Sequence, residues 1–156
     1  MLYKLSTVSK TIYLKENNSI QELRKTKSII LFDGLCNFCD HSVQFVIKRD
    51  PDDEFLYASL QSKSGKEFLK NQDSEIQNID SILLVTNEKI YTKSSAALKI
   101  ASKLSAHWYL SGIFFILPKP LRDSVYDFIA KRRYQWFGKY DSCKIPTSEQ
   151  RSKFLV

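Results

Sequence analysis

The sequence predicts an α/β fold with a mixed sheet, and three observations predict it. A short apolar run at residues 29–32 leads directly into Asp33-Gly34 and then into a helical pattern. A second strand-like run follows at 54–58, and two strands joined by a helix pair in parallel with a right-handed connection. A hairpin pattern at 81–92 then adds antiparallel pairing. Parallel and antiparallel neighbours together make a mixed sheet.

The first helix is predicted from a repeat of apolar residues that begins at the second cysteine. The spacing i, i+4, i+7, i+8 places these residues on one helix face: Cys39, Val43, Val46 and Ile47. Asp50-Pro51 ends the helix, because the residue before a proline is disfavoured in the helical region. Residues 29–58 therefore form a strand–helix–strand unit.

The middle of the chain continues this alternation. The pattern at residues 62–70 predicts a weaker helix anchored by Phe68 and Leu69. The polar run at 71–78 predicts a loop. The β-rich runs 81–85 and 89–92 flank a short polar turn, which is typical of an antiparallel hairpin.

A further helix is expected after the hairpin. Ser94 or Ser95 can cap it, and its apolar face has helical spacing: Ala97, Leu98, Ala101 and Leu104. The resulting order is β-α-β-α-β-β-α. With a CxxC pair at the start of the first helix, this is the order of a thioredoxin-like core.

The chain length of 156 residues suits a single domain with modest extensions. We expect a basic N-terminal extension at 1–27, a core at 28–106 and a helical C-terminal extension at 107–156 packed on the core. The last long helix is predicted from 121 to about 137. Six apolar residues are expected to form its buried face: Leu121, Val125, Phe128, Ile129, Trp136 and Phe137.

The net charge of +7 is concentrated at the two ends of the chain. Residues 1–27 contain six basic and two acidic residues, and residues 119–156 contain nine basic and four acidic residues. The middle of the chain, 28–118, contains nine basic and eleven acidic residues. Such ends suit an acidic partner, an anionic membrane or nucleic acid, but solvated lysines are the preferred interpretation. No nucleic-acid motif occurs, and no apolar run approaches the ~20 residues of a transmembrane segment.

Cysteine usage indicates the compartment. Three cysteines are too few for a disulfide framework, and an odd number argues against an oxidised secreted scaffold. Residues 1–27 contain no continuous apolar stretch of the kind a secretory signal needs. We therefore expect a reducing compartment and a cytoplasmic location.

Cys36 and Cys39 are the strongest chemical signal. A helix N-terminus carries unpaired N–H groups and the positive end of the helix dipole, so it stabilises a thiolate. In a dithiol–disulfide mechanism Cys36, expected to be the more exposed, attacks a substrate disulfide, and Cys39 resolves the mixed disulfide. Two alternatives remain open, structural thiols and a zinc site drawn from these ligands: Cys36, Cys39, Cys143, His41 and His107.

Four other residues are weighed as site candidates. Asp33 either tunes the thiols as a third catalytic residue or holds the turn by accepting N–H groups, and the structural role is preferred. His41 is interpreted as a surface residue, and Arg133 as part of an exposed basic helix face. Cys143 is interpreted as a buried thiol in preference to a third redox group.

Asp33, Cys36 and Cys39 in D-G-L-C-N-F-C also fit the Asp-x-x-Cys-x-x-Cys signature, and here the chain resembles the DCC family of thiol-disulfide oxidoreductases. The resemblance extends through five further stretches: S-V-Q-F at 42–45, A-S-L-Q-S at 58–62, Ser95-Ala96, 126–138 with R-Y-Q-W-F-G, and C-K-I-P-T at 143–147. It implies a thioredoxin-like fold and oxidoreductase activity. The chain departs from thioredoxins in having no proline between Pro51 and Pro118, where those proteins place a cis-proline before the third core strand.

The leading hypothesis is thus a thiol-disulfide oxidoreductase with the Cys36/Cys39 dithiol and no bound cofactor or metal. Its expected partners are a disulfide-containing protein or small thiol substrate and a cellular thiol reductant, with no nucleic acid. The alternative is a non-catalytic module that binds a protein or membrane surface and carries a redox-sensitive CxxC. A small zinc protein is the third hypothesis.

Overall fold

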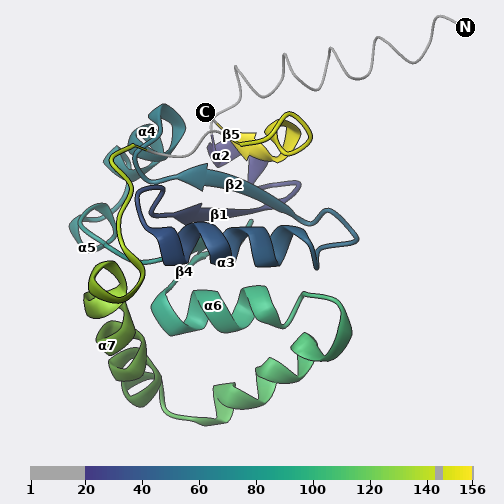
Figure 1. Cartoon of the computed structure of the whole chain (residues 1–156). Helices are drawn as coiled ribbons and strands as arrows, with labels where there is room; N and C mark the ends of the chain where they lie inside the picture. Colours follow the sequence, from purple (N-terminus) through teal and green to yellow (C-terminus); the bar gives the residue numbers. More distant parts are fainter. Residues whose placement is uncertain (1–19, 143–145, 156) are drawn as a thin grey trace, which may run out of the picture.

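The computed structural model describes residues 20–142 and 146–155, which form a sheet with helices on both faces (Figure 1). The strands are β1 (Ser28–Phe32), β2 (Phe55–Ser59), β3 (Leu83–Val85), β4 (Ile90–Thr92) and β5 (Phe154–Leu155). The helices are α2 (Ile20–Leu23), α3 (Asn37–Ile47), α4 (Lys63–Lys70), α5 (Ser74–Gln77), α6 (Lys93–Ala101) and α7 (Lys119–Phe137), with 3₁₀ segments η1 (Ala106–Ile116) and η2 (Arg151–Lys153).

The five strands form one mixed sheet in the order β4-β3-β1-β2-β5. β1 pairs with β2 in parallel, from Ser28 opposite Phe55 to Phe32 opposite Ser59, and pairs with β3 antiparallel. The predicted β-α-β-α-β-β-α order is therefore confirmed, and the architecture is consistent with a thioredoxin-like fold. Because β1 is central, its carboxyl end and the turn after it lie in the middle of the sheet edge.

Two apolar clusters hold the sheet between its helices. One joins the sheet to α3 and α6 through Val43, Ala96 and Ile100. The other joins the opposite face to α2 and α4 through Ile20 and Phe68. The helical spacing predicted Val43 and Phe68, because burial of one face fixes a helix on the sheet. For α6 it predicted the wrong face, since Ala96 and Ile100 are buried and, of the four residues expected there, Ala97 is exposed and only Leu104 is buried.

Several local features differ from the predictions or were not predicted. Residue Ile20 of the N-terminal extension is buried against the core, and the rest of that extension, 1–19, lies outside the described residues. Within the expected loop 71–78 one helical turn forms, α5. Thr92, and neither Ser94 nor Ser95, is the N-cap of α6. The two-residue strand β5, which pairs in parallel with β2, was not predicted.

The largest correction concerns α7. The six apolar residues expected to be its buried face are 36 to 56 % exposed. The helix instead turns polar side chains toward the protein: Asp123, Tyr126, Asp127, Arg133 and Tyr134. Each of them finds a hydrogen-bond partner on the core, as buried polar groups require, although the Nε of Arg133 is buried without a partner. Among the described residues, no helix combines the length and apolar character needed to span a membrane.

Candidate dithiol site

The site begins where β1 ends. Phe32 completes the strand, Asp33-Gly34 makes the turn, and Cys36 is the N-cap of α3 with extended backbone (φ −91°, ψ 120°). Its sulfur accepts the backbone N–H of Cys39 at 3.3 Å. Both cysteines are free thiols in the structure. The predicted placement of the pair in the first turn of the helix is confirmed.

The relative exposure of the two thiols is the reverse of the expectation. Cys36 has 0 % exposed surface, whereas Cys39 is partly exposed. The reason lies in the chain after α7, which returns over the start of α3. Lys139 forms an antiparallel bridge with Cys36, and the Tyr140 N–H donates to the Leu35 carbonyl at 2.8 Å.

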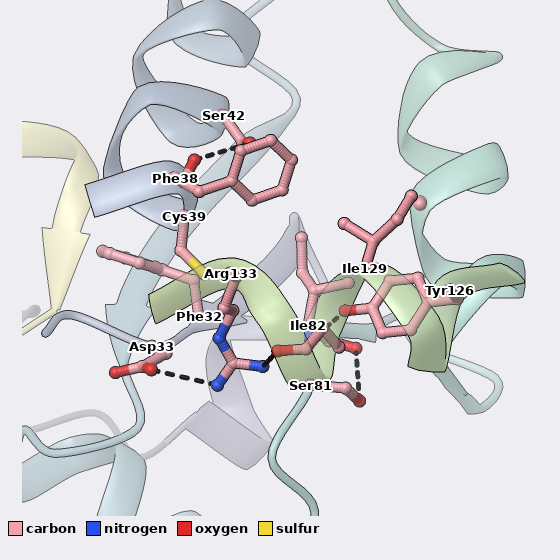
Figure 2. Close-up of a pocket in the computed structure, with 12 residues that line it drawn as sticks. Phe32, Asp33, Phe38, Cys39, Ser42, Ser81, Ile82, Tyr126, Ile129 and Arg133 are labelled. Atoms are coloured by element: carbon pink, nitrogen blue, oxygen red, sulfur yellow. Dashed lines mark hydrogen bonds and ion pairs between the residues drawn. The ribbon is translucent and has the colours of Figure 1, made fainter. Parts of the chain in front are cut away.

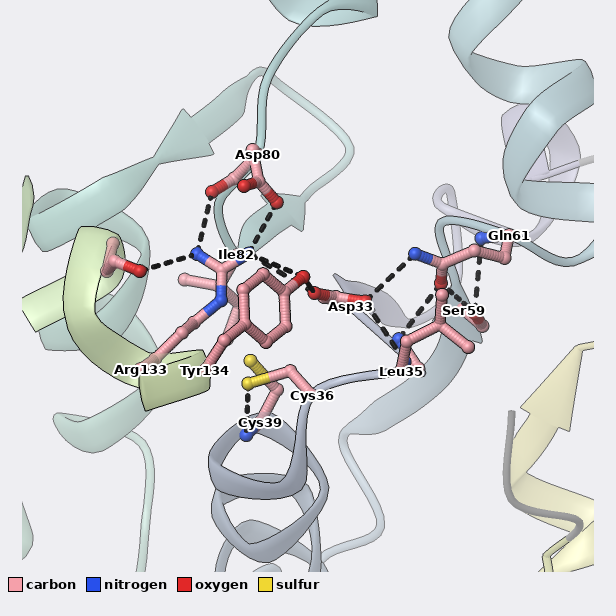
Figure 3. Close-up of polar contacts among 12 residues, drawn as sticks. Asp33, Leu35, Cys36, Cys39, Ser59, Gln61, Asp80, Ile82, Arg133 and Tyr134 are labelled. Carbon is pink, nitrogen blue, oxygen red and sulfur yellow. Dashed lines mark hydrogen bonds and ion pairs between the residues drawn. The ribbon is translucent and has the colours of Figure 1, made fainter. Parts of the chain in front are cut away.

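Asp33 is the centre of a buried polar network (Figure 3). One carboxylate oxygen accepts the Leu35 N–H at 3.0 Å and the Gln61 amide at 2.9 Å. The other accepts the Arg133 guanidinium at 3.2 Å and the Tyr134 hydroxyl. The residue is 3 % exposed, so all of these bonds form away from bulk water.

This network keeps Asp33 ionised. Burial alone raises the pKa of a carboxyl, but the hydrogen bonds from Tyr134, Leu35, Arg133 and Gln61 outweigh it and leave the pKa of Asp33 below its ordinary value. Burial and the Asp33 charge together raise the pKa of Tyr134 to about 12. At neutral pH the carboxylate is therefore an acceptor that fixes the turn, as the structural interpretation of Asp33 expects.

Arg133 supplies the opposite charge. It is 4 % exposed and pairs with Asp33 and with Asp80, and it donates to the Asp80 carbonyl at 3.2 Å. The interpretation of Arg133 as part of an exposed basic face was wrong. Burial lowers the pKa of a guanidinium, but its bonds to Tyr134 and Asp80 reverse this and raise the pKa of Arg133. A permanent positive charge thus lies in the pocket that Cys39 lines.

Cys39 faces a different environment. It lines a pocket of about 270 Å³ together with mainly apolar side chains (Figure 2): Phe32, Phe38, Ile82, Ala97, Ile129 and Ala130. Burial, reinforced by the hydrogen bond and charge of Cys36, raises the pKa of the Cys39 thiol. The pocket thus favours the protonated form of the Cys39 thiol.

Comparison with known proteins identifies the family of the chain. A family model described as DCC1-like thiol-disulfide oxidoreductase matches residues 30–139, which includes the turn, the dithiol and α7. The chain belongs to this family. No solved structure matches it.

Two curated relatives support the DCC1-like assignment. The uncharacterized protein YuxK of Bacillus subtilis is 46 % identical over 127 residues, which cover 81 % of this chain and 93 % of the relative. A DCC family protein of Arabidopsis thaliana, named as chloroplastic, is 36 % identical over 134 residues, which cover 85 % of this chain and 77 % of the relative.

Sequence reasoning missed three residues of this DCC1-like site, Gln61, Tyr126 and Tyr134, and misplaced a fourth, Arg133, on the surface. Gln61 lies in A-S-L-Q-S and the other three lie in 126–138, so the stretches that carry the DCC resemblance contained the signal. Tyr126 is notable because its hydroxyl accepts the Ile82 N–H at 3.0 Å, directly before β3. Thioredoxins are expected to expose backbone for a substrate chain at that place.

The remaining candidates lie apart from the sulfurs or outside the description. His41 is exposed, and its Nδ1 bonds the Asn37 carbonyl at 2.8 Å, in agreement with a surface role. Cys143 lies outside the described residues, so neither interpretation of it is tested. The side chain of His107 is also outside the description, and among the side chains that the structure describes no three of His, Cys, Asp or Glu cluster to hold a metal ion.

Proposed function

We propose that the protein is a thiol-disulfide oxidoreductase in which Cys36 and Cys39 exchange two electrons with a substrate. The observation that carries the proposal is the pairing of two free thiols in the first turn of α3, with the Cys36 sulfur accepting the Cys39 N–H. Membership of the DCC1-like family supports it.

In the proposed reaction the Cys36 thiolate attacks one sulfur of a substrate disulfide. A mixed disulfide forms, and the first substrate thiolate leaves and takes a proton. Cys39 then loses its proton and attacks the Cys36 sulfur, which releases the second substrate thiol and leaves a Cys36–Cys39 disulfide. The dithiol is oxidised and the substrate is reduced by two electrons, and a cellular thiol reverses the change.

The surroundings of the sulfurs support this division of roles. The raised pKa of Cys39 keeps that thiol protonated until the second step, which suits the resolving role proposed for it. Asp33, proposed as the third site residue, acts by fixing the turn before Cys36 and by holding Arg133 in place. The Arg133 charge lowers the pKa of Cys39, against the stronger effect of burial, and so eases the loss of its proton in the second step.

Access to Cys36 requires movement of the segment that covers it. Cys36 has no exposed surface, and Lys139 and Tyr140 hold the chain over it by backbone contacts. Gly138 precedes them with φ 81°, a conformation that residues with a side chain rarely adopt. We propose that the chain from Gly138 to Tyr140 lifts when a substrate disulfide approaches.

The proposed substrates are a disulfide-containing protein or a small disulfide, with a cellular thiol system as reductant. The proposed compartment is the cytoplasm, on the ground of cysteine usage. The chemistry needs no cofactor beyond the two sulfurs.

Trapping of the intermediate tests the proposal. Cys39→Ser removes the resolving thiol, so incubation with a model disulfide is expected to accumulate a mixed disulfide on Cys36, seen by mass spectrometry. Cys36→Ser is expected to accumulate none. Equal trapping by both variants, or a mixed disulfide on the Cys39 of Cys36→Ser alone, contradicts the assigned roles.

The burial of Cys36 favours a second candidate function. In it the protein is a non-catalytic binding module whose CxxC changes structure on oxidation. Turnover of a model disulfide with a thiol reductant separates the two candidates, because the module forms its disulfide without catalysing repeated exchange.

A further inference from the structure

The outward side of the C-terminal region carries an extended apolar surface. Five consecutive residues at 113–117 are exposed where η1 ends, and Ile116 reaches 81 % exposure. The surface continues along α7 through Leu121, Val125 and Phe128, at spacing i, i+4, i+7. We call these eight residues the outer apolar surface. Large exposed apolar side chains that gather in one region of a monomeric protein commonly mark an interaction site.

The charged side chains beside the outer apolar surface are basic. Arg122 lies over the Phe115 ring at 5.0 Å, and Arg132 lies over the Phe128 ring at 4.0 Å. Lys99 of α6 also approaches Phe115, at 5.8 Å. Arg132 and Lys99 are in the arrangement that lets a long basic side chain keep its charge in a polar layer, whereas Arg122 donates its Nε–H to the Leu117 carbonyl at 3.1 Å and has a buried Nη1.

The acidic residues of the same region are turned away. Asp123 accepts the Ser94 hydroxyl and pairs with Lys119, while Asp127 pairs with Lys93 at 2.8 Å. Ser94 and Lys93 belong to the first turn of α6, so both carboxylates lie on the inward side of α7. From residue 105 to residue 122 the sequence contains no acidic residue. The outward side is thus apolar and cationic.

We propose that the outer apolar surface docks on a lipid bilayer that carries anionic headgroups. The side chains at 113–117 enter the boundary between headgroups and acyl chains, and the basic side chains at its edge contact the lipid phosphates and carboxylates. The binding is peripheral and is separate from the proposed redox chemistry, since none of the eight residues lines the pocket that holds Cys39.

The charge pattern argues against a second copy as the occupant. In a twofold contact the same surface faces itself, so Arg122 and Arg132 of one copy approach those of the other without carboxylates between them. A bilayer offers negative charge and an apolar layer together, which matches the two components of the surface.

Vesicle flotation of the whole chain tests the proposal. The wild type is expected to float with phosphatidylcholine vesicles that contain phosphatidylglycerol and not with phosphatidylcholine alone. Ile116→Asp, a change at the most exposed apolar residue, is expected to reduce binding about tenfold, the loss expected when one buried apolar side chain is replaced. Lys70→Gln removes the same unit of charge from α4 on the opposite face and is expected to change binding less than about twofold.

Each other outcome overturns the proposal. Equal loss in Ile116→Asp and Lys70→Gln means that binding is adsorption by net charge alone. Absence of flotation in the wild type, with a dimer that Ile116→Asp converts to monomer, means that a second copy covers the surface. Absence of both means that the surface does not bind bilayers. Circular dichroism of Ile116→Asp confirms that a loss of binding is not a loss of fold.

Discussion

The two faces of α7 have opposite chemistry, and the polar one is turned inward. The inward face carries Arg133 and Tyr134, which bond to the buried carboxylate of Asp33. The outward face carries Val125 and Phe128, both more than half exposed. A surface helix of a globular protein ordinarily has the reverse arrangement.

This difference shows that the surface on which a helix packs determines which face of the helix is buried. α7 lies over the carboxyl edge of β1, where the turn presents an ionised Asp33 and not an apolar strand face. A buried carboxylate needs charged and hydrogen-bonding partners, and α7 supplies them. Its apolar residues Val125 and Phe128 are left on the outside. The experiments below test this contrast, in order of decreasing effect on stability.

The largest effect is expected from Arg133→Met. The substitution keeps an unbranched apolar stem but leaves the buried Asp33 carboxylate without its counter-charge. Breaking a buried ion pair costs about 3 to 5 kcal/mol of unfolding free energy. Urea denaturation measures the loss. Arg132→Met, one residue earlier on the outward side, is the matched control and should cost less than about 1 kcal/mol.

Asp33→Asn is expected to cost about 1.5 to 3 kcal/mol at neutral pH, the range for hydrogen bonds to a charged group. Because the folded pKa of Asp33 lies below its unfolded value, its stabilisation is complete above the unfolded value of about 4 and is lost as pH falls through the folded pKa. The difference in unfolding free energy between wild type and variant should therefore become smaller as the pH is lowered. If this difference in unfolding free energy stays constant from neutral to acid pH, Asp33 is not ionised in the folded protein.

Tyr126→Phe is expected to cost about 1 to 2 kcal/mol, since it leaves the Ile82 N–H without the hydroxyl that accepts it. Tyr91→Phe removes a hydroxyl from β4 and serves as control. If both variants melt at the same temperature as the wild type, the Tyr126 contact adds nothing to the attachment of α7.

The smallest effect is expected on the outward face. Val125→Ser replaces an exposed apolar side chain and should change the unfolding free energy by less than about 0.5 kcal/mol. A loss comparable with that of Arg133→Met means that the outward face is packed in solution and that the contrast between the faces is wrong.

Local sequence patterns were sufficient for the sheet and for α3. The apolar run at β1 and the helical spacing of Val43 and Val46 report burial directly, so both elements were predicted within a few residues. The two-residue strand β5 has no such signal, because it exists only by pairing with the edge of β2.

The errors at the site have a different cause, which is contact between distant parts of the chain. Asp33 and Arg133 are 100 residues apart, and no period or spacing joins them. The cover over Cys36 comes from Lys139, so local sequence around the CxxC predicted exposure where the structure has burial. The residue types at the CxxC indicated its chemistry, but they did not indicate whether solvent or a substrate reaches Cys36.

A redox titration of the Cys36–Cys39 pair tests the central claim most directly. The protein is equilibrated in buffers of graded thiol–disulfide ratio, free thiols are alkylated, and mass spectrometry of the peptides identifies the disulfide. The account predicts one two-electron transition in which Cys36 and Cys39 join to each other. Thiols that remain reduced across the whole range, or oxidation that joins either cysteine to Cys143 instead, contradict the account.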